Sequence, residues 1–160
     1  MAAERQNVKR SAVPYANASR GMAARDEITK LLRRFGCESV GFMDDFGDRS
    51  VLLAFAHRGR SVQLKASAKG WATLWLKENP WTPRRRCTQK EYEQDAIRQG
   101  LIAVNSILRD WVKGQVTAVE CGMLSFESVF LPYMLAADGR SVIEHLADVK
   151  MLPAPVESPL

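Results

Sequence analysis

The chain has few residues of the kinds that build metal centres and disulfide frameworks. Its 160 residues include three cysteines and two histidines, and no Cys-x-x-Cys pair is present. Three separated cysteines do not make a disulfide framework, and neither histidine, His57 or His145, has the spacing from a cysteine that zinc ligands have. We therefore expect no metal and no cofactor, and both histidines are interpreted as ordinary surface or rim residues. Reduced cysteines favour a cytoplasmic protein.

Long apolar runs and familiar catalytic motifs are also missing. No stretch approaches the roughly 20 apolar residues that a membrane-spanning helix needs. Residues 1–24 lack the apolar segment of a signal peptide. Neither the Gly-x-x-x-x-Gly-Lys phosphate loop nor the Gly-x-Ser-x-Gly turn of serine hydrolases occurs. We expect a protein that has no membrane partner and is not an enzyme.

What the sequence does contain is the pattern of an α+β domain. Apolar residues at helical spacing predict a helix from about Arg25 to Phe35, ended by Gly36. Alternating apolar residues then predict an antiparallel sheet of three strands, at residues 40–44, 50–57 and 60–65. The central strand has apolar residues on both faces, so we expect a second layer to cover its other face.

Helical signals dominate the second half of the chain. A short helix is expected within residues 66–83, and a capping box at Thr88 and Glu91 predicts a long helix to about Cys121. Short helices are expected from Ser125 and from Ser141. The predicted fold is thus an N-terminal helix, a three-stranded antiparallel sheet, a long helix and short C-terminal helices packed on the sheet.

The chain divides into three parts by composition. Residues 1–22 form a basic N-terminal arm, residues 23–150 a single α+β domain, and residues 151–160 a proline-rich tail. The long helix of the domain is a candidate surface for pairing with a second copy of the chain.

Positive charge is concentrated in residues 58–90. This segment holds nine lysines and arginines against one acid, Glu78, and three of the four tryptophans. Trp71 and Trp75 are expected in the core under the sheet, whereas Trp81 lies between prolines and is expected to be exposed. Basic and aromatic residues together are typical of surfaces that bind nucleic acid. The candidate binding residues of this segment and the arm are Trp81, Arg84, Arg85, Arg86, Lys77, Arg58, Arg60, Lys9 and Arg10.

The C-terminal half carries a series of short motifs in a fixed order. They are Val119-Glu-Cys-Gly122, Phe126-Glu127, Phe130-Leu-Pro-Tyr133 and Asp138-Gly-Arg-Ser-Val142. In this order they resemble a group of small uncharacterised proteins encoded by bacteriophages and prophages, over roughly residues 25–146. The resemblance implies a phage origin and a role in the host cytoplasm, and it implies no activity. The Trp-rich stretch 71–81 and the basic arm depart from the pattern of that group.

Three hypotheses about function follow from these residues. The first is an accessory protein that binds DNA or RNA through the basic segment. The second is a protein-binding module that inhibits or redirects a host enzyme or defence complex, with Trp81 as an anchor against an acidic partner. The third is a metal-dependent nuclease that uses Asp44, Asp45 and Asp48, although these residues also have the composition of an ordinary β-turn.

Overall fold

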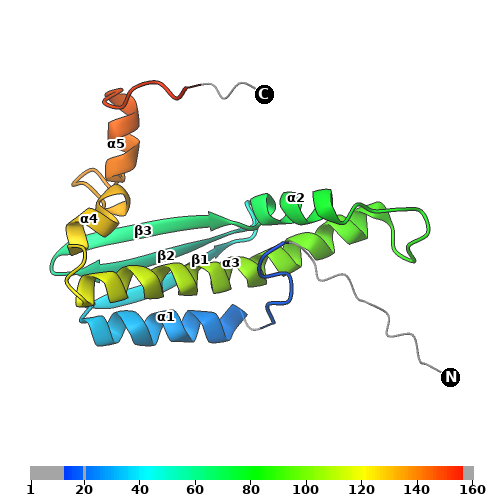
Figure 1. The fold of residues 1–160 in the computed structure, drawn as a ribbon, viewed down its shortest axis with the longest axis horizontal. Helices are drawn as coiled ribbons and strands as arrows, with labels where there is room; N and C mark the ends of the chain where they lie inside the picture. The colour runs from blue at the N-terminus through cyan, green and yellow to red at the C-terminus, as the bar shows by residue number, and fades with distance from the viewer. Residues whose placement is uncertain (1–12, 20, 157–160) are drawn as a thin grey trace.

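The computed structural model describes residues 13–19 and 21–156, and it has the α+β architecture that the sequence predicts. An N-terminal helix and three strands are followed by a short helix, a long helix and three short helical segments (Figure 1). In chain order these are α1 (Gly21–Phe35), β1 (Ser39–Asp45), β2 (Ser50–His57), β3 (Arg60–Ser67), α2 (Ala68–Glu78), α3 (Gln89–Glu120), α4 (Phe126–Phe130), the 3₁₀ turn η1 (Leu131–Tyr133) and α5 (Val142–Asp148).

The first helix begins earlier than its apolar spacing predicts. α1 starts at Gly21, and its first turn packs closely on α3. A Cβ at Gly21 would lie 3.4 Å from Nδ2 of Asn105 and 3.7 Å from Cα of Ile102, so the missing side chain permits this approach. Contact with a distant segment thus adds a turn that local sequence does not reveal. Gly36 ends the helix with a φ of +102°, as predicted.

The three strands form one antiparallel sheet in the order β1-β2-β3. Arg58 and Gly59 connect β2 to β3 with φ values of +48° and +75°, the left-handed conformations of a tight two-residue hairpin turn. The turn fixes the register in which Leu53 faces Leu64, so that alternate residues of both strands point to the same face. The predicted hairpin is therefore confirmed.

The main core lies between one face of the sheet and the helices α1 and α3 (Figure 1). It includes Ile28 and Leu32 of α1 and the residues of α3 at helical spacing that end at Val116. The other face of the sheet is more open, because Leu52 is half-buried there and Met43 is 65% exposed. The apolar stripe of α3 packs against α1, α2 and the sheet of the same chain.

A second, smaller cluster joins α2 to the N-terminal half of α3. Trp71 is buried there with Val13 and Ala103, and the half-buried Trp75 packs beside them. The indole nitrogen of Trp71 donates a hydrogen bond to the carbonyl of Pro14, 2.9 Å away. The expected burial of Trp71 is confirmed, but its expected place under the sheet is wrong. The described end of the arm, residues 13–19, is docked on these helices.

A glycine on α3 allows α2 to pack this closely. A Cβ at Gly100 would lie 2.8 Å from the carbonyl oxygen of Ala68 and 3.4 Å from the ring of Trp71, whereas a Cβ at Gly114 would meet nothing within 4 Å. We expect Gly100→Ala to destabilise the fold by about 1–3 kcal/mol through overpacking. Gly114→Ala should instead stabilise it by up to about 1 kcal/mol through helix propensity. Urea denaturation measures the free energy of unfolding of the two variants. Equal changes of the same sign would contradict the close packing of α2 on Gly100.

The C-terminal segments leave the end of the sheet at which β2 and β3 turn. Residues 134 and 135 extend the sheet through a bridge between Met134 and Val62, and Leu135 N–H donates to the carbonyl of Ser61 at 2.8 Å. From there α5 extends away from the sheet (Figure 1). Capping boxes begin both α3 and α5, as predicted. Among the described residues, no helix combines the length and apolar character needed to cross a bilayer.

Candidate functional site

The residues 79–88, called the basic loop from here on, connect α2 to α3 at the end of the molecule opposite α4 and α5 (Figure 1). The loop contains Arg84, Arg85 and Arg86 and no acidic residue. All three arginines are exposed, as predicted. The structure therefore presents three adjacent positive charges on a projecting segment.

Hydrogen bonds to side chains hold the ends of the basic loop in place. The hydroxyl of Tyr92 donates to the carbonyl of Asn79 at 2.8 Å, and the Asn79 side-chain amide donates to the carbonyl of Trp75 at 3.1 Å. At the other end, Thr88 and Glu91 form the capping box of α3. Because both ends are held by the neighbouring helices, the arginines stand on a defined backbone rather than on an unsupported segment.

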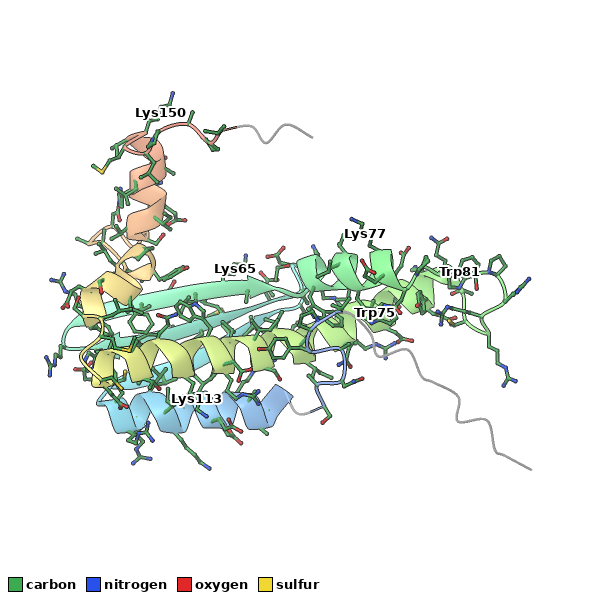
Figure 2. The ribbon with its side chains drawn as sticks, viewed as in Figure 1. Lys65, Trp75, Lys77, Trp81, Lys113 and Lys150 are labelled. Atoms are coloured by element: carbon green, nitrogen blue, oxygen red, sulfur yellow. The ribbon has the colours of Figure 1, made fainter. Side chains whose placement is uncertain are left out.

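Trp81 lies inside the basic loop and not on its outer surface. Its side chain is half-buried, and the indole nitrogen donates to the carbonyl of Cys87 at 3.0 Å (Figure 2). The expected exposure of Trp81 is therefore wrong, because its indole bonds across the base of the loop. Only part of this ring is available to a partner.

The three arginines differ in how they are held. The guanidinium of Arg85 lies over the ring of Tyr92, 4.5 Å from its centroid, which is a cation–π arrangement. For Arg84 and Arg86 the described part of the chain offers no hydrogen bond or ion pair. Their full positive charge is thus directed at solvent.

Many other basic side chains are neutralised by a carboxylate. The pairs are Arg25 with Asp44, Arg34 with Glu120, Lys65 and Lys69 with Asp48, Arg98 with Asp95, Arg109 with Asp110, and Arg140 with Asp148. Glu91, the acidic residue of the capping box of α3, is also engaged in hydrogen bonds. Glu91 accepts from the backbone and hydroxyl of Thr88, and these hydrogen bonds lower the pKa of its carboxyl group. This carboxylate is held at the helix N-terminus.

The other predicted binding residues do not all lie beside the basic loop. Lys77 is exposed on α2, close in sequence to the loop, and it points away from the helix (Figure 2). Arg58 and Arg60 are exposed at the β2–β3 turn, at the opposite end of the sheet from α2. Lys9 and Arg10 lie outside the described residues. The structure therefore separates the basic segment into two distant surfaces.

The three aspartates of the nuclease hypothesis do not converge on one point. Asp44 accepts two hydrogen bonds from Arg25, and this contact lowers the pKa of its carboxyl group. Asp45 accepts from the backbone N–H of Asp48, and Asp48 pairs with Lys65 at 2.8 Å. Among the described residues, no three acidic, histidine or cysteine side chains are grouped as metal ligands. The turn between β1 and β2 accounts for Asp45 and Asp48, and the contact with Arg25 accounts for Asp44.

The two histidines have different surroundings, and only His145 is the surface or rim residue expected. His145 is partly exposed and lies 2.9 Å from a carboxylate oxygen of Asp138. His57 is buried, with 6% of its surface exposed, and its ring stacks on Phe35 at 4.6 Å between centroids. The expectation for His57 is therefore wrong. His57 follows Phe55 by two residues, so both side chains point to the buried face of β2. This alternation is the sequence signal that could have predicted its burial.

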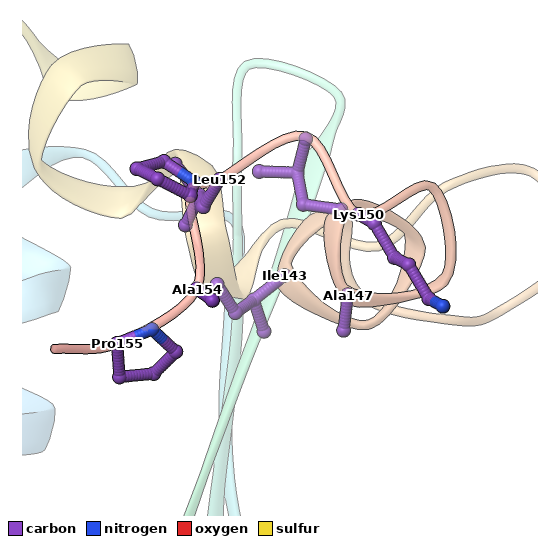
Figure 3. A pocket seen from close by; sticks show the side chains of 8 residues that line it. Ile143, Ala147, Lys150, Leu152, Ala154 and Pro155 are labelled. Atoms are coloured by element: carbon purple, nitrogen blue, oxygen red, sulfur yellow. The ribbon is translucent and has the colours of Figure 1, made fainter. Parts of the chain in front are cut away.

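An apolar pocket of about 580 Å³ lies between α5 and the chain that follows it (Figure 3). Ile143 and Ala147 of α5 form one wall, and Leu152 and Pro155 form the other. Leu152 is 69% exposed, and the nearby Met151 is 68% exposed. This surface contains little charge, in contrast to the basic loop at the other end of the molecule.

Comparisons with known protein families, curated proteins and solved structures give no match for this chain. Function is therefore inferred from the residues themselves.

Proposed function

We propose that the chain binds nucleic acid through the basic loop. The observation that carries this proposal is the pair Arg84 and Arg86, which are exposed and without an ion pair in the described part of the chain. Arginine fits the phosphate group well, because its planar guanidinium donates two parallel hydrogen bonds to the oxygens. Holding the loop ends before binding reduces the ordering cost of that contact.

The contacts that this surface offers are to the backbone of the nucleic acid. The basic loop has three arginines, and its only large aromatic side chain is half-buried with its N–H already bonded to Cys87. Charge contacts position a protein on nucleic acid without reading the bases. The proposed binding is therefore weakly dependent on sequence, and Lys77 adds a further charge on the adjoining helix.

Salt dependence tests the proposal on the unmodified chain. Each phosphate contact releases condensed counterions, so the logarithm of the binding constant falls with the logarithm of salt concentration, by about 0.9 per contact on duplex DNA. We expect fluorescence anisotropy with a labelled 20-nucleotide probe to show binding at about 50 mM salt, with a slope near −3 for three arginine contacts. If the chain binds neither a single-stranded nor a double-stranded probe at that salt concentration, the proposal is refuted.

The C-terminal apolar surface favours a second candidate, a protein-binding module. Exposed apolar residues gathered around a pocket are a common feature of surfaces that meet another protein. Ile143 is 43% exposed and Leu152 is 69% exposed on the two walls of this pocket. If the chain shows no affinity for nucleic acid, binding of a host or phage protein at this surface becomes the favoured function.

The setting that we propose for either function is the cytoplasm of a bacterium infected by a phage. This part of the proposal is supported by the order of the C-terminal motifs, which include Gly122, Phe126-Glu127 and Asp138-Gly139. In the fold Gly122 and Gly139 have φ values of +72° and +81°, and Phe126 is buried, so these motif residues have structural reasons to be present. Because these residues have structural roles, the motifs support a common origin with the phage proteins that they resemble, and they do not support a shared activity.

A further inference from the structure

A second hollow lies at the end of the molecule opposite the basic loop. It encloses about 420 Å³, within the range of about 300–1,000 Å³ that is usual for small-molecule sites. Four elements meet around it: the ends of α1 and α3, the β2–β3 turn, and α4. Its lining residues are Phe35, His57, Arg58, Arg60, Val119, Phe126 and Glu127, and we call it the His57 pocket.

The buried histidine gives this pocket a polar group that the fold itself does not use. His57 packs against both Phe35 and Phe126, with ring centroids 4.6 and 4.8 Å away. Its Nδ1 is enclosed and finds no hydrogen-bond partner among the described residues. A buried polar atom without a partner is costly, and such atoms often mark a functional site. Packing alone would be served better by a phenylalanine at this position.

The second ring nitrogen is the one that can reach a ligand. Nε2 of His57 is not enclosed in the same way, and the ring lines the pocket. An unpaired acceptor is tolerated better in a protein interior than an unpaired N–H. With Nδ1 as the unpaired acceptor, we assign an N–H to Nε2, from which it can be donated into the pocket.

The charged residues of the rim add more donors and one acceptor. Arg58 and Arg60 are both exposed, and neither side chain forms an ion pair within the described part of the chain. Two guanidinium groups beside an imidazole N–H match an anion such as a phosphate group. Glu127, on the α4 side, accepts hydrogen bonds from hydroxyl or amino groups. Val119 and the aromatic residues supply the apolar wall.

We propose that the His57 pocket binds a nucleoside monophosphate. The phosphate group lies against Arg58 and Arg60, His57 donates to it through Nε2, and Glu127 accepts from the sugar hydroxyls or a base amino group. The base lies along the apolar wall. This site is separate from the basic loop, and the inference does not require the loop to bind nucleic acid.

Calorimetric titration of the full chain with AMP, GMP, CMP and UMP tests the inference. Adenosine and inorganic phosphate serve as probes that each lack half of the proposed ligand. We expect at least one monophosphate to bind, and Arg60→Gln to weaken it about tenfold or more, the effect of losing a charged hydrogen bond. Lys30→Gln removes an exposed charge from α1 outside the pocket and should leave the affinity unchanged.

A second variant separates a ligand site from a structural one. His57→Phe keeps the aromatic stack and removes the unpaired nitrogen, so we expect a higher melting temperature together with about tenfold or greater loss of affinity. The inference is overturned if none of the four monophosphates binds at millimolar concentration, or if Arg60→Gln leaves the affinity unchanged. Equally tight binding of adenosine or of inorganic phosphate would also overturn it, because the pocket would then recognise only one half of the nucleotide.

Discussion

Reversing the charge of Arg84 and Arg86 together should nearly abolish binding to nucleic acid. Both side chains are exposed and lack an ion pair within the described part of the chain, so the double change Arg84→Glu and Arg86→Glu breaks no ion pair there. We expect an affinity loss of about a hundredfold, from two charge-assisted hydrogen bonds. The salt slope should become shallower by about 2, because two phosphate contacts are lost.

A matched control distinguishes the basic loop from the net charge of the chain. Arg33 on α1 and Lys113 on α3 are also exposed and have no ion pair among the described residues. The double change Arg33→Glu and Lys113→Glu alters the net charge by the same amount at a different surface. We expect the control to retain most of the affinity and the slope. Equal losses in the two variants would show that binding follows total charge and that the loop is not the site.

Replacing Phe130 by alanine should have the largest effect on stability. Phe130 on α4 has no exposed surface, and its ring meets those of Phe55, Trp111 and Phe126 at centroid distances of 5.4, 5.8 and 5.0 Å. A buried phenylalanine contributes through its apolar area and through the cavity that its removal leaves. We expect Phe130→Ala to lower the free energy of unfolding by about 3–5 kcal/mol, measured by urea denaturation.

The next residue supplies the control for this change. Leu131 is 47% exposed, so Leu131→Ala removes a side chain of similar character without opening an internal cavity. We expect its cost to stay below about 1 kcal/mol. Phe130→Ala should also leave nucleic-acid binding unchanged at temperatures where it remains folded, since α4 and the basic loop lie at opposite ends of the molecule (Figure 1). A similar cost for both variants would contradict the role of Phe130 in the core.

Residues close in sequence account for most of the fold that could be predicted. The period of two in β2 and the spacing of Ile28, Leu32 and Phe35 in α1 are visible because one face of each element is buried. The capping boxes at Thr88 and Ser141 were visible for a different reason, since the residues that form each box lie within one turn. In each case the determining contacts are local or follow a local period.

The candidate binding site was predicted only in part. The exposure of Arg84–Arg86 follows from their charge, which is costly to bury. The inward position of Trp81 did not follow, because it depends on a hydrogen bond to Cys87 across the base of the loop. Tyr92 was missed altogether, and nothing in the sequence except its closeness to the capping box connects it with Asn79 and Arg85.

By itself the sequence determined the fold class, the order of the elements and the exposed positive charge of the basic loop, because periodicity, capping and the cost of burying charge act over short stretches of chain. Only the tertiary structure decided which charges remain unpaired, that Arg58 and Arg60 lie far from the loop, and that His57 is enclosed by Phe35 and Phe126. These outcomes depend on contacts between residues distant in sequence, and those contacts exist only once the helices have packed on the sheet.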